Sequence, residues 1–519
     1  TRGLEGTGMV QTVPPEAVLQ LEAAKVNSAG RGEDARVVTM AEVTRAGTVV
    51  NGMVYLTGDS LQIEALVTDV RNNRVVASVV SAPAPLSDPM AAVETIRQRV
   101  AGALASTFDN YISQYADVLG QPPTYEAYRL FVEAQRMSDR AHTAGGDHLF
   151  AEALPVFLEA VELDSTLVAA YLRAGWMAFA SGSPAMAESL AYVADARRDR
   201  LTPIGQAQLD LLLAETKGDR AAALRAARRQ PGWPLDLALR ANQVNRPGEA
   251  VSILTEAEWY PSVLRSAGLY GVEIIYWGTL SEGYHLLGEH EAELEAARQA
   301  RQLYPQNLDA ANLEGRALAA LGRLDELDDL LDRAADFPTA GRWVETPASL
   351  MVVAAFELRA HGYPEAARDA GDRATAWFNS HPLEDPNDRA RRSALALAYY
   401  SADRWSEARA LYEELAAEYP DSVNFQGFLG TLAARRGDRD EARRISDHLA
   451  GLNDPYDFGR DTYWQACITA LLEEREQAME LLQRSFAEGR RFNLQMHRDL
   501  DLEDLFDYPP FQEFLKPKG

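Results

Sequence analysis

The spacing of apolar residues along the chain changes near residue 110. Before it, short β-rich runs between Val49 and Ala82 are separated by turn residues at positions 57–59 and 71–73, which predicts a meander of three antiparallel strands. In the middle run apolar and polar residues alternate, as in a strand with one buried face. Apolar residues four apart between Asp88 and Asp109 then predict an amphipathic helix on this sheet.

Two further elements are expected upstream, a short strand near Met9–Val13 and a helix from about Glu33 to Ala46. With them, residues 1–112 are predicted to form a small α/β domain that lacks its first strand. A proline-bearing joint at residues 121–123 follows, and residues 113–145 are predicted to form a helical connector.

A repeat dominates residues 146–496, where strand patterns disappear and Ala, Leu, Glu and Arg prevail. A helix break recurs and is followed five residues later by a small residue, as in Gly182 with Ala187 and Gly437 with Ala442. Five of the nine spacings lie within two residues of 34, the length of a helix-turn-helix unit. The predicted breaks are His148, Gly182, Gly218, Asn245, Gly288, Gly322, Gly362, Asp403, Gly437 and Glu473.

The second helix of a unit is predicted to end at a proline about 17 residues after the break, as at Pro305 and Pro420. This arrangement resembles the tetratricopeptide repeat (TPR). The resemblance implies a mostly α fold, an α-α superhelical solenoid of about ten helix pairs preceded by the α/β domain. Glu293 and Leu327 depart from the pattern by replacing the small residue, so wider helix spacing is expected there.

Two further resemblances bear on function. The segments LEGTGMVQTVPP (4–15) and AGTVVNGMVYLTGDSLQIEALVTDV (46–70) resemble the α/β domain related to FlgO and to the amino-terminal domain of TolB. The segments at Pro122–Ala134, Leu149–Tyr171 and His497–Gly519 resemble the carboxy-terminal half of repeat-bearing bacterial serine/threonine protein kinases or adenylate cyclases.

These resemblances imply a non-catalytic protein–protein interaction and sensing module of a bacterial signalling protein, the region that follows a serine/threonine kinase domain and a membrane span. The implied location is the extracytoplasmic, periplasmic face of a bacterial membrane, with the cytoplasm as the alternative. The alternative function is a free-standing periplasmic TPR scaffold or assembly protein without a kinase.

The composition of the chain argues against several classes of binding partner. The formal net charge of −26, from 51 Lys+Arg against 77 Asp+Glu, argues against nucleic acid and anionic lipid, whose binding needs clustered cations. One cysteine, Cys467, excludes an intrachain disulfide framework. No apolar run approaches ~18 residues, so no membrane span is expected in this chain. The chain begins at Thr1 without a leader, so any tether or targeting signal is expected upstream. The oligomeric state stays open.

The sequence motifs that resemble catalytic, cofactor-binding or metal-binding sites are incomplete. His497-Arg498-Asp499-Leu500 matches the start of a kinase catalytic loop, but Asp504 stands where that loop needs a metal-binding Asn. The glycines of residues 3–8 precede a strand, where a dinucleotide-binding fingerprint would follow one, so we interpret them as a turn. The eight histidines offer no H-E-x-x-H and no pair of histidines four apart, which leaves a metal site unsupported. We therefore expect no catalytic residue, no cofactor, no metal and no enzymatic activity.

The remaining candidate for function is a binding surface, above all the concave groove that stacked helix pairs create for a protein or peptide ligand. Alignment of each first helix on its break places five residues on or near this groove: Asn312, Arg316, Arg359, Tyr400 and Arg435. They are the candidate peptide-binding residues; the alternative is that they are solvated or paired with neighbouring acids. Residues 497–519 are predicted to be a solvated capping segment.

Overall fold

The structure is a computed structural model of the chain and describes residues 11–14, 16–20, 41–72, 74–109, 111, 122–144, 148–230, 232–266, 269–338, 341–382, 387–452 and 454–518. The chain forms two compact units. The first comprises residues 1–141 and 146–213, and the second comprises residues 142–145 and 214–519.

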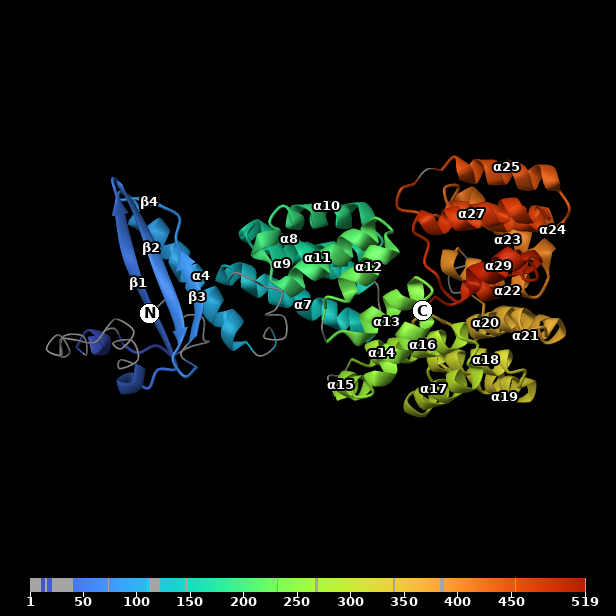
Figure 1. The fold of residues 1–519 in the computed structure, drawn as a ribbon, viewed down its shortest axis with the longest axis horizontal. Helices are drawn as coiled ribbons and strands as arrows, with labels where there is room; N and C mark the ends of the chain where they lie inside the picture. The colour runs from blue at the N-terminus through green and yellow to red at the C-terminus, as the bar shows by residue number, and fades with distance from the viewer. Residues whose placement is uncertain are drawn as a thin grey trace. The chain divides into compact units, whose positions relative to one another are not determined.

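The predicted meander is confirmed. Strands β1 (Thr48–Thr57), β2 (Ser60–Asp69) and β3 (Arg74–Val80) pair antiparallel in that order, and the short β4 (Ala84–Pro85) pairs with β2 (Figure 1). Helix α4 (Pro89–Phe108) packs on β2 and β3. The alternation in β2 has the expected effect, because Ala65 and Val67 are buried against Val100 and Leu104 of α4.

The upstream elements are described only in part. Met9 and Val10, and residues 33–40 of the predicted helix, lie outside the described residues, while residues 11–14 contain no strand and residues 41–44 are helical. The missing first strand stays a prediction. In the described part of the chain no strand follows Pro85.

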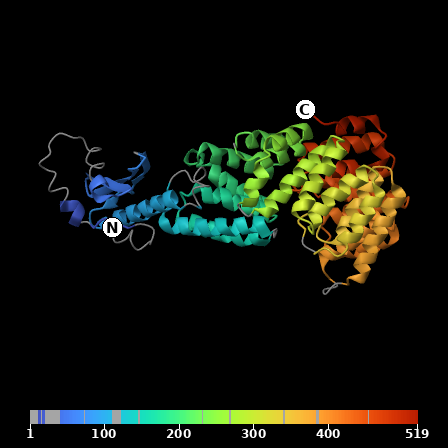
Figure 2. The same cartoon turned by 90° about the horizontal axis from the view of Figure 1, so that it is seen from below.

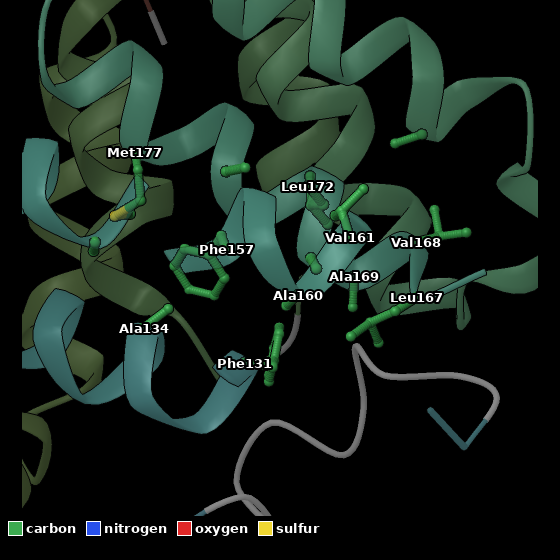
Figure 3. Close-up of a cluster of buried hydrophobic side chains, with 14 of the residues drawn as sticks. Phe131, Ala134, Phe157, Ala160, Val161, Leu167, Val168, Ala169, Leu172 and Met177 are labelled. Atoms are coloured by element: carbon green, nitrogen blue, oxygen red, sulfur yellow. The ribbon is translucent and has the colours of Figure 1, made fainter. Parts of the chain in front are cut away.

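The helices of the first unit pack around a core of aromatic and small side chains. They are α7 (Tyr125–Ala144), α8 (His148–Leu163), α9 (Val168–Ala180), α10 (Pro184–Asp195), the 3-10 turn η1 (Arg198–Arg200) and most of α11 (Pro203–Thr216). Figure 3 shows this core, in which Phe131 and Phe157 meet edge to face with ring centroids 5.6 Å apart. Small residues such as Ala134 and Ala160 are fully buried beside them, which allows the helices to approach closely.

The second unit continues the same helix pairs. It contains α12 (Arg220–Ala227), α13 (Pro234–Gln243), α14 (Pro247–Glu256), α15 (Tyr260–Ser266), α16 (Tyr270–Leu286), α17 (His290–Leu303), α18 (Leu308–Ala320), α19 (Leu324–Ala334), α20 (Pro347–Ala360), α21 (Pro364–Ser380), α22 (Arg389–Ser401), α23 (Trp405–Glu418), α24 (Val423–Arg435), α25 (Arg439–Ala450), α26 (Arg460–Leu471), α27 (Arg475–Ala487), α28 (Gln495–Arg498), the 3-10 helix η2 (Leu500–Leu505) and α29 (Pro509–Leu515). The long spacing between Asn245 and Gly288 reflects the additional helix α15.

Backbone conformation confirms the predicted breaks. A left-handed residue ends the first helix of each pair, a position that favours Gly or Asn. It occurs at Gly182, Gly218, Asn245, Gly288, Gly322, Gly362, Asp403, Gly437 and Glu473. His148 differs, because it is the first residue of α8. The small residues five positions after the breaks, including Ala187 and Ala442, are fully buried. The fold is therefore a TPR-like solenoid of helix pairs preceded by a small α/β layer.

The carboxy-terminal segment, residues 490–518, folds back within the second unit. The backbone N–H of Phe492 donates to the carbonyl of Gln243 (3.0 Å), and that of Lys518 donates to the carbonyl of Asn245 (2.7 Å). The end of the chain therefore lies beside α13 and the turn that follows it (Figures 1 and 2). None of the helices in the described ranges combines the length and apolarity that crossing a bilayer requires.

Candidate binding site on the inner face of the second unit

A cavity of about 1020 Å³ lies on the inner face of the second unit. Its walls are first helices of successive pairs, α13, α16, α18, α20, α22, α24 and α26, and its remaining side is formed by residues 491–501. Apolar walls come from aromatic residues such as Trp343, Phe356 and Trp464. Polar groups project among them, which is the usual composition of a ligand site.

Part of the carboxy-terminal segment is bound to this face through charged groups. Arg498 pairs with Glu357 on α20 (2.9 Å), and the Tyr463 hydroxyl donates to Asp499 (2.6 Å). Glu357 is only 1% exposed. The expectation of a solvated segment at 497–519 is therefore wrong for this stretch, because it supplies partners for charges that the helices bury.

The tightest contact of the segment is at Asp501. Its carboxylate accepts hydrogen bonds from the hydroxyl of Tyr400 (2.5 Å) and from Arg435 (2.8 Å), and Arg435 also donates to the carbonyl of Leu500 (2.8 Å). Burial raises the pKa of Tyr400, and the neighbouring Asp501 raises it further. Tyr400 therefore remains a neutral hydrogen-bond donor.

The five predicted groove residues all lie in this region. Asn312, Arg316 and Tyr400 line the cavity, and Arg359 and Arg435 hold the carboxy-terminal segment. Arg359 pairs with Asp403 (2.6 Å) and with Glu503 (3.3 Å), and Arg316 pairs with Glu293 (2.6 Å). Their charges are thus matched by acids of the same chain, as in the alternative interpretation given above.

Two asparagines of the cavity retain unused hydrogen-bonding capacity. The side-chain oxygens of Asn242 and Asn312 are buried and have no hydrogen-bond partner within the described structure, although both residues line the cavity. An acceptor in this position costs free energy until a donor reaches it. A ligand that brings N–H groups would supply that donor.

The buried Glu215 contacts three arginines near the C-terminal ends of α11 and α13. It contacts Arg220 (2.5 Å), Arg240 (3.1 Å) and Arg491 (3.1 Å), the last from the carboxy-terminal segment. Burial by itself would raise the pKa of Glu215, but the three guanidinium groups together lower it. Glu215 therefore stays ionised. Arg240 also contacts Asp236 (3.2 Å), so the three arginines exceed the acids by one positive charge at this end of the cavity.

A histidine cluster lies close to the cavity and was not predicted. The rings of His285, His290 and His361 lie 4.8–5.6 Å from one another, centroid to centroid. His285 contacts a carboxylate through each ring nitrogen, Glu293 through Nδ1 (2.8 Å) and Glu357 through Nε2 (2.9 Å). The cluster therefore joins α16, α17 and the turn after α20.

The charges of this cluster are strongly coupled. Burial would lower the pKa of His285, but Glu357 and Glu293 raise it to about 9. Burial would raise the pKa of Glu293, but Arg316 and His285 lower it to about 2. Both carboxylates therefore remain ionised at neutral pH, and their charges are matched by His285, Arg316 and Arg498.

Two features of the sequence point to this cluster in retrospect. Glu293 stands five residues after the break at Gly288, where most other repeats place a buried alanine. Glu357 and His361 are four residues apart at the end of α20, so they project from the same side of the helix. Each of these features includes a glutamate, so a search for pairs of histidines alone does not detect them.

The rejected motifs have structural roles where they are described. Arg498 and Asp499 bind Glu357 and Tyr463, as above, and Asp499 also caps η2. Cys467 is fully buried in α26, and burial raises the pKa of its thiol. Gly3, Gly6 and Gly8 lie outside the described residues.

Comparison with known proteins adds a general likeness in fold. No family model and no curated protein match the sequence. Similar solved structures include a tetratricopeptide repeat protein from Parabacteroides merdae (13% identity, TM-score 0.28, covering 65% of this chain and 98% of that one) and yeast Tom70 (14%, 0.31, 71% and 87%). A human IFIT1 dimer with PPP-AAAA is also similar (14%, 0.28, 69% and 77%). Identities and TM-scores this low assign neither a function nor a ligand to the chain.

Proposed function

We propose that the chain is a non-catalytic protein–protein interaction module that binds a peptide segment of a partner in the cavity of the second unit. The observation that carries this proposal is the path of residues 491–501, which lie on the inner face and are held there by side chains of successive first helices. A partner segment can use the same kind of contact in the remaining space.

The unused acceptors indicate what the ligand supplies. Asn242 and Asn312, on α13 and α18, can each accept a hydrogen bond from a backbone N–H of an extended peptide once a side-chain rotation brings the buried oxygen to the cavity. The excess of arginines around Glu215 favours a carbonyl-rich or carboxylate-bearing end of the ligand. Because the whole chain carries a net charge of −26, a partner that is neutral or basic overall approaches more readily than an acidic one.

Site-specific crosslinking tests this proposal. A photoreactive amino acid at Val353, which lines the cavity, should crosslink the partner, and the same group at the exposed Glu365 on α21 should not. A synthetic peptide of the crosslinked segment is then titrated against the wild type and Asn312→Ala. We expect Asn312→Ala to weaken binding about 5- to 30-fold, the loss of about 1–2 kcal/mol of peptide hydrogen bonding.

The matched control is Gln299→Ala, which removes an exposed amide from α17, outside the cavity. Its affinity should equal that of the wild type. Equal crosslinking from Val353 and Glu365, or equal affinities of the Asn312 and Gln299 variants, would show that the cavity is not the recognition site. Arg316 and Arg359 are poor choices for this test, because alanine there leaves acids of the same chain unpaired.

A narrower proposal rests on the resemblances. We infer that the module is the sensor region of a bacterial signalling protein, after a serine/threonine kinase domain and on the extracytoplasmic side of the membrane. The sheet and helix of residues 48–108, placed directly before the repeats, support it. Alkaline phosphatase fused to the native full-length protein should be active; activity of a cytoplasm-only reporter instead would contradict this location. An open reading frame without a kinase domain upstream would favour the free-standing scaffold.

A further inference from the structure

Three of the eight histidines of the chain meet in one place within the described structure. His285, His290 and His361 have their rings in mutual contact. The charges of His285, Glu357 and His361 also act on His497. These residues come from α16, α17, the end of α20 and α28, so neighbours in sequence do not explain the convergence. Imidazole and carboxylate are the ligand set that Zn²⁺ and related ions prefer.

Two overlapping groups have the required geometry. In the first, ligand atoms of His285, Glu357 and His361 lie within 4.8 Å of one another; in the second, those of His285, His290 and Glu293 do. In the first group Glu357 Oε1 is 2.9 Å from His285 Nε2 and 3.5 Å from His361 Nε2. Ligands of a tetrahedral zinc ion at about 2.0–2.1 Å lie roughly 3.4 Å apart, so small side-chain rotations suffice.

We propose that His285, Glu357 and His361 bind a single divalent transition-metal ion of the Zn²⁺ class. This assignment does not depend on the peptide-binding function proposed above. The ion would be coordinated by Nε2 of both histidines and by Oε1 of Glu357, and it would keep one open position.

The surroundings of this group are those of a supported metal site. His285 directs its other nitrogen, Nδ1, at Glu293 (2.8 Å), and Glu293 is itself fixed by Arg316 (2.6 Å). A carboxylate on the second ring nitrogen orients a metal-binding histidine and raises its basicity. The second oxygen of Glu357 is held by Arg498 (2.9 Å), which leaves Oε1 to face the two histidines.

His497, on α28, is a further imidazole that interacts electrostatically with His285, Glu357 and His361. Its Nε2 is buried and has no hydrogen-bond partner in the described structure. Burial and the charge of His285 lower the pKa of His497 to about 4, so it is a neutral imidazole. His361 is 25% exposed and gives an ion a route from solvent.

The alternative is a purely ionic network in which a proton on His285 joins the two carboxylates. The test uses the full chain, treated with a chelator, dialysed and titrated with ZnSO₄ by calorimetry. We expect one ion per chain. His361→Gln should weaken binding by on the order of 100-fold, whereas His448→Gln, which changes an exposed histidine on α25, should leave the affinity within twofold of the wild type.

His290→Gln separates the two groups, and we expect an affinity within about threefold of the wild type. The unfolding temperature of each metal-free variant shows whether folding is retained. X-ray absorption of the zinc-loaded wild type gives an independent result that needs no variant: only nitrogen and oxygen ligands, with imidazole scattering. A sulfur ligand would place the ion at Cys467. That result, absence of zinc binding, or loss of binding in His290→Gln but not in His361→Gln would overturn the assignment.

Discussion

The hydroxyl group of Tyr400 holds the carboxy-terminal segment on the inner face, and its removal has a calculable effect. The hydroxyl donates to Asp501 (2.5 Å) and contacts the hydroxyl of Thr431 (3.0 Å) inside a site where Tyr400 is 1% exposed. Tyr400→Phe keeps the ring and its packing on Trp405 and Phe428. It therefore removes only the hydrogen bonds.

The magnitude follows from the charge on the acceptor. A hydrogen bond to a charged group contributes about 1.5–3 kcal/mol, and Asp501 keeps its contact with Arg435 (2.8 Å). We expect Tyr400→Phe to destabilise the segment by about 2 kcal/mol, a factor of roughly thirty in its opening equilibrium. Tyr412 provides the matched control, because it is 0% exposed and its hydroxyl has no hydrogen-bond partner within the described structure. Tyr412→Phe should be neutral or stabilise by up to about 1 kcal/mol.

Native-state hydrogen exchange measures this opening directly, without assuming that 519 residues unfold in one step. The amide of Leu502, which donates to the carbonyl of Asp499 (3.1 Å), is the reporter. Its exchange should be roughly thirty times faster in Tyr400→Phe and unchanged in Tyr412→Phe. Equal exchange in both variants would refute the argument, and faster exchange in Tyr412→Phe alone would show that packing, not the hydrogen bond to Asp501, fixes the segment.

Three further predictions use the same unit. The pKa of Glu215 is lowered in the folded state, so its ionised form stabilises the fold at pH values above its unfolded pKa, and this stabilisation is lost as the pH falls through the folded pKa. Glu215→Gln should therefore lower the unfolding temperature at pH 7. In this variant the unfolding temperature should also decrease less than in the wild type between about pH 5 and 3. Gly322→Ala should cost about 1–3 kcal/mol more than Gly437→Ala by urea unfolding, since both positions are left-handed but only the first would place a Cβ 2.0 Å from the Tyr363 hydroxyl, which must then move; equal costs would contradict the clash. Cys467 should resist a thiol reagent until the second unit unfolds, because it is fully buried and burial raises its pKa; rapid labelling of native protein would show that α26 opens.

The repeat architecture was predictable because its causes are local. A left-handed residue at a helix end favours Gly, Asn or Asp, and a buried crossing point favours Ala, so both leave a mark at fixed spacing. The prolines at 305 and 420 follow the ends of α17 and α23 by two residues, as the fixed φ of proline and its effect on the preceding residue require. The three-stranded meander was predictable for the same reason.

The candidate site was predictable only in outline. Alignment on the breaks placed Asn312, Arg316 and Tyr400 on the correct face, because helical periodicity fixes the face of each residue. It could not show that Asp501 returns to pair with Tyr400 across 101 positions. Residues 497–519 were predicted to be a solvated segment, yet Asp501 is 2% exposed. Its partners Tyr400 and Arg435 are distant in the sequence, so the sequence pattern around Asp501 does not reveal its burial.

Glu293 shows how a departure from the repeat carries information. A charged residue in a helix crossing that otherwise holds alanine costs several kcal/mol unless its charge is matched, and here Arg316, His285 and His290 match it. Replacement by alanine would restore the repeat pattern but would leave Arg316 and the histidines without their acid. The position where the sequence predicts wider helix spacing therefore holds a charge network. The repeat geometry itself requires no such network. The departure at Glu293 therefore indicates that this repeat has a role beyond helix packing.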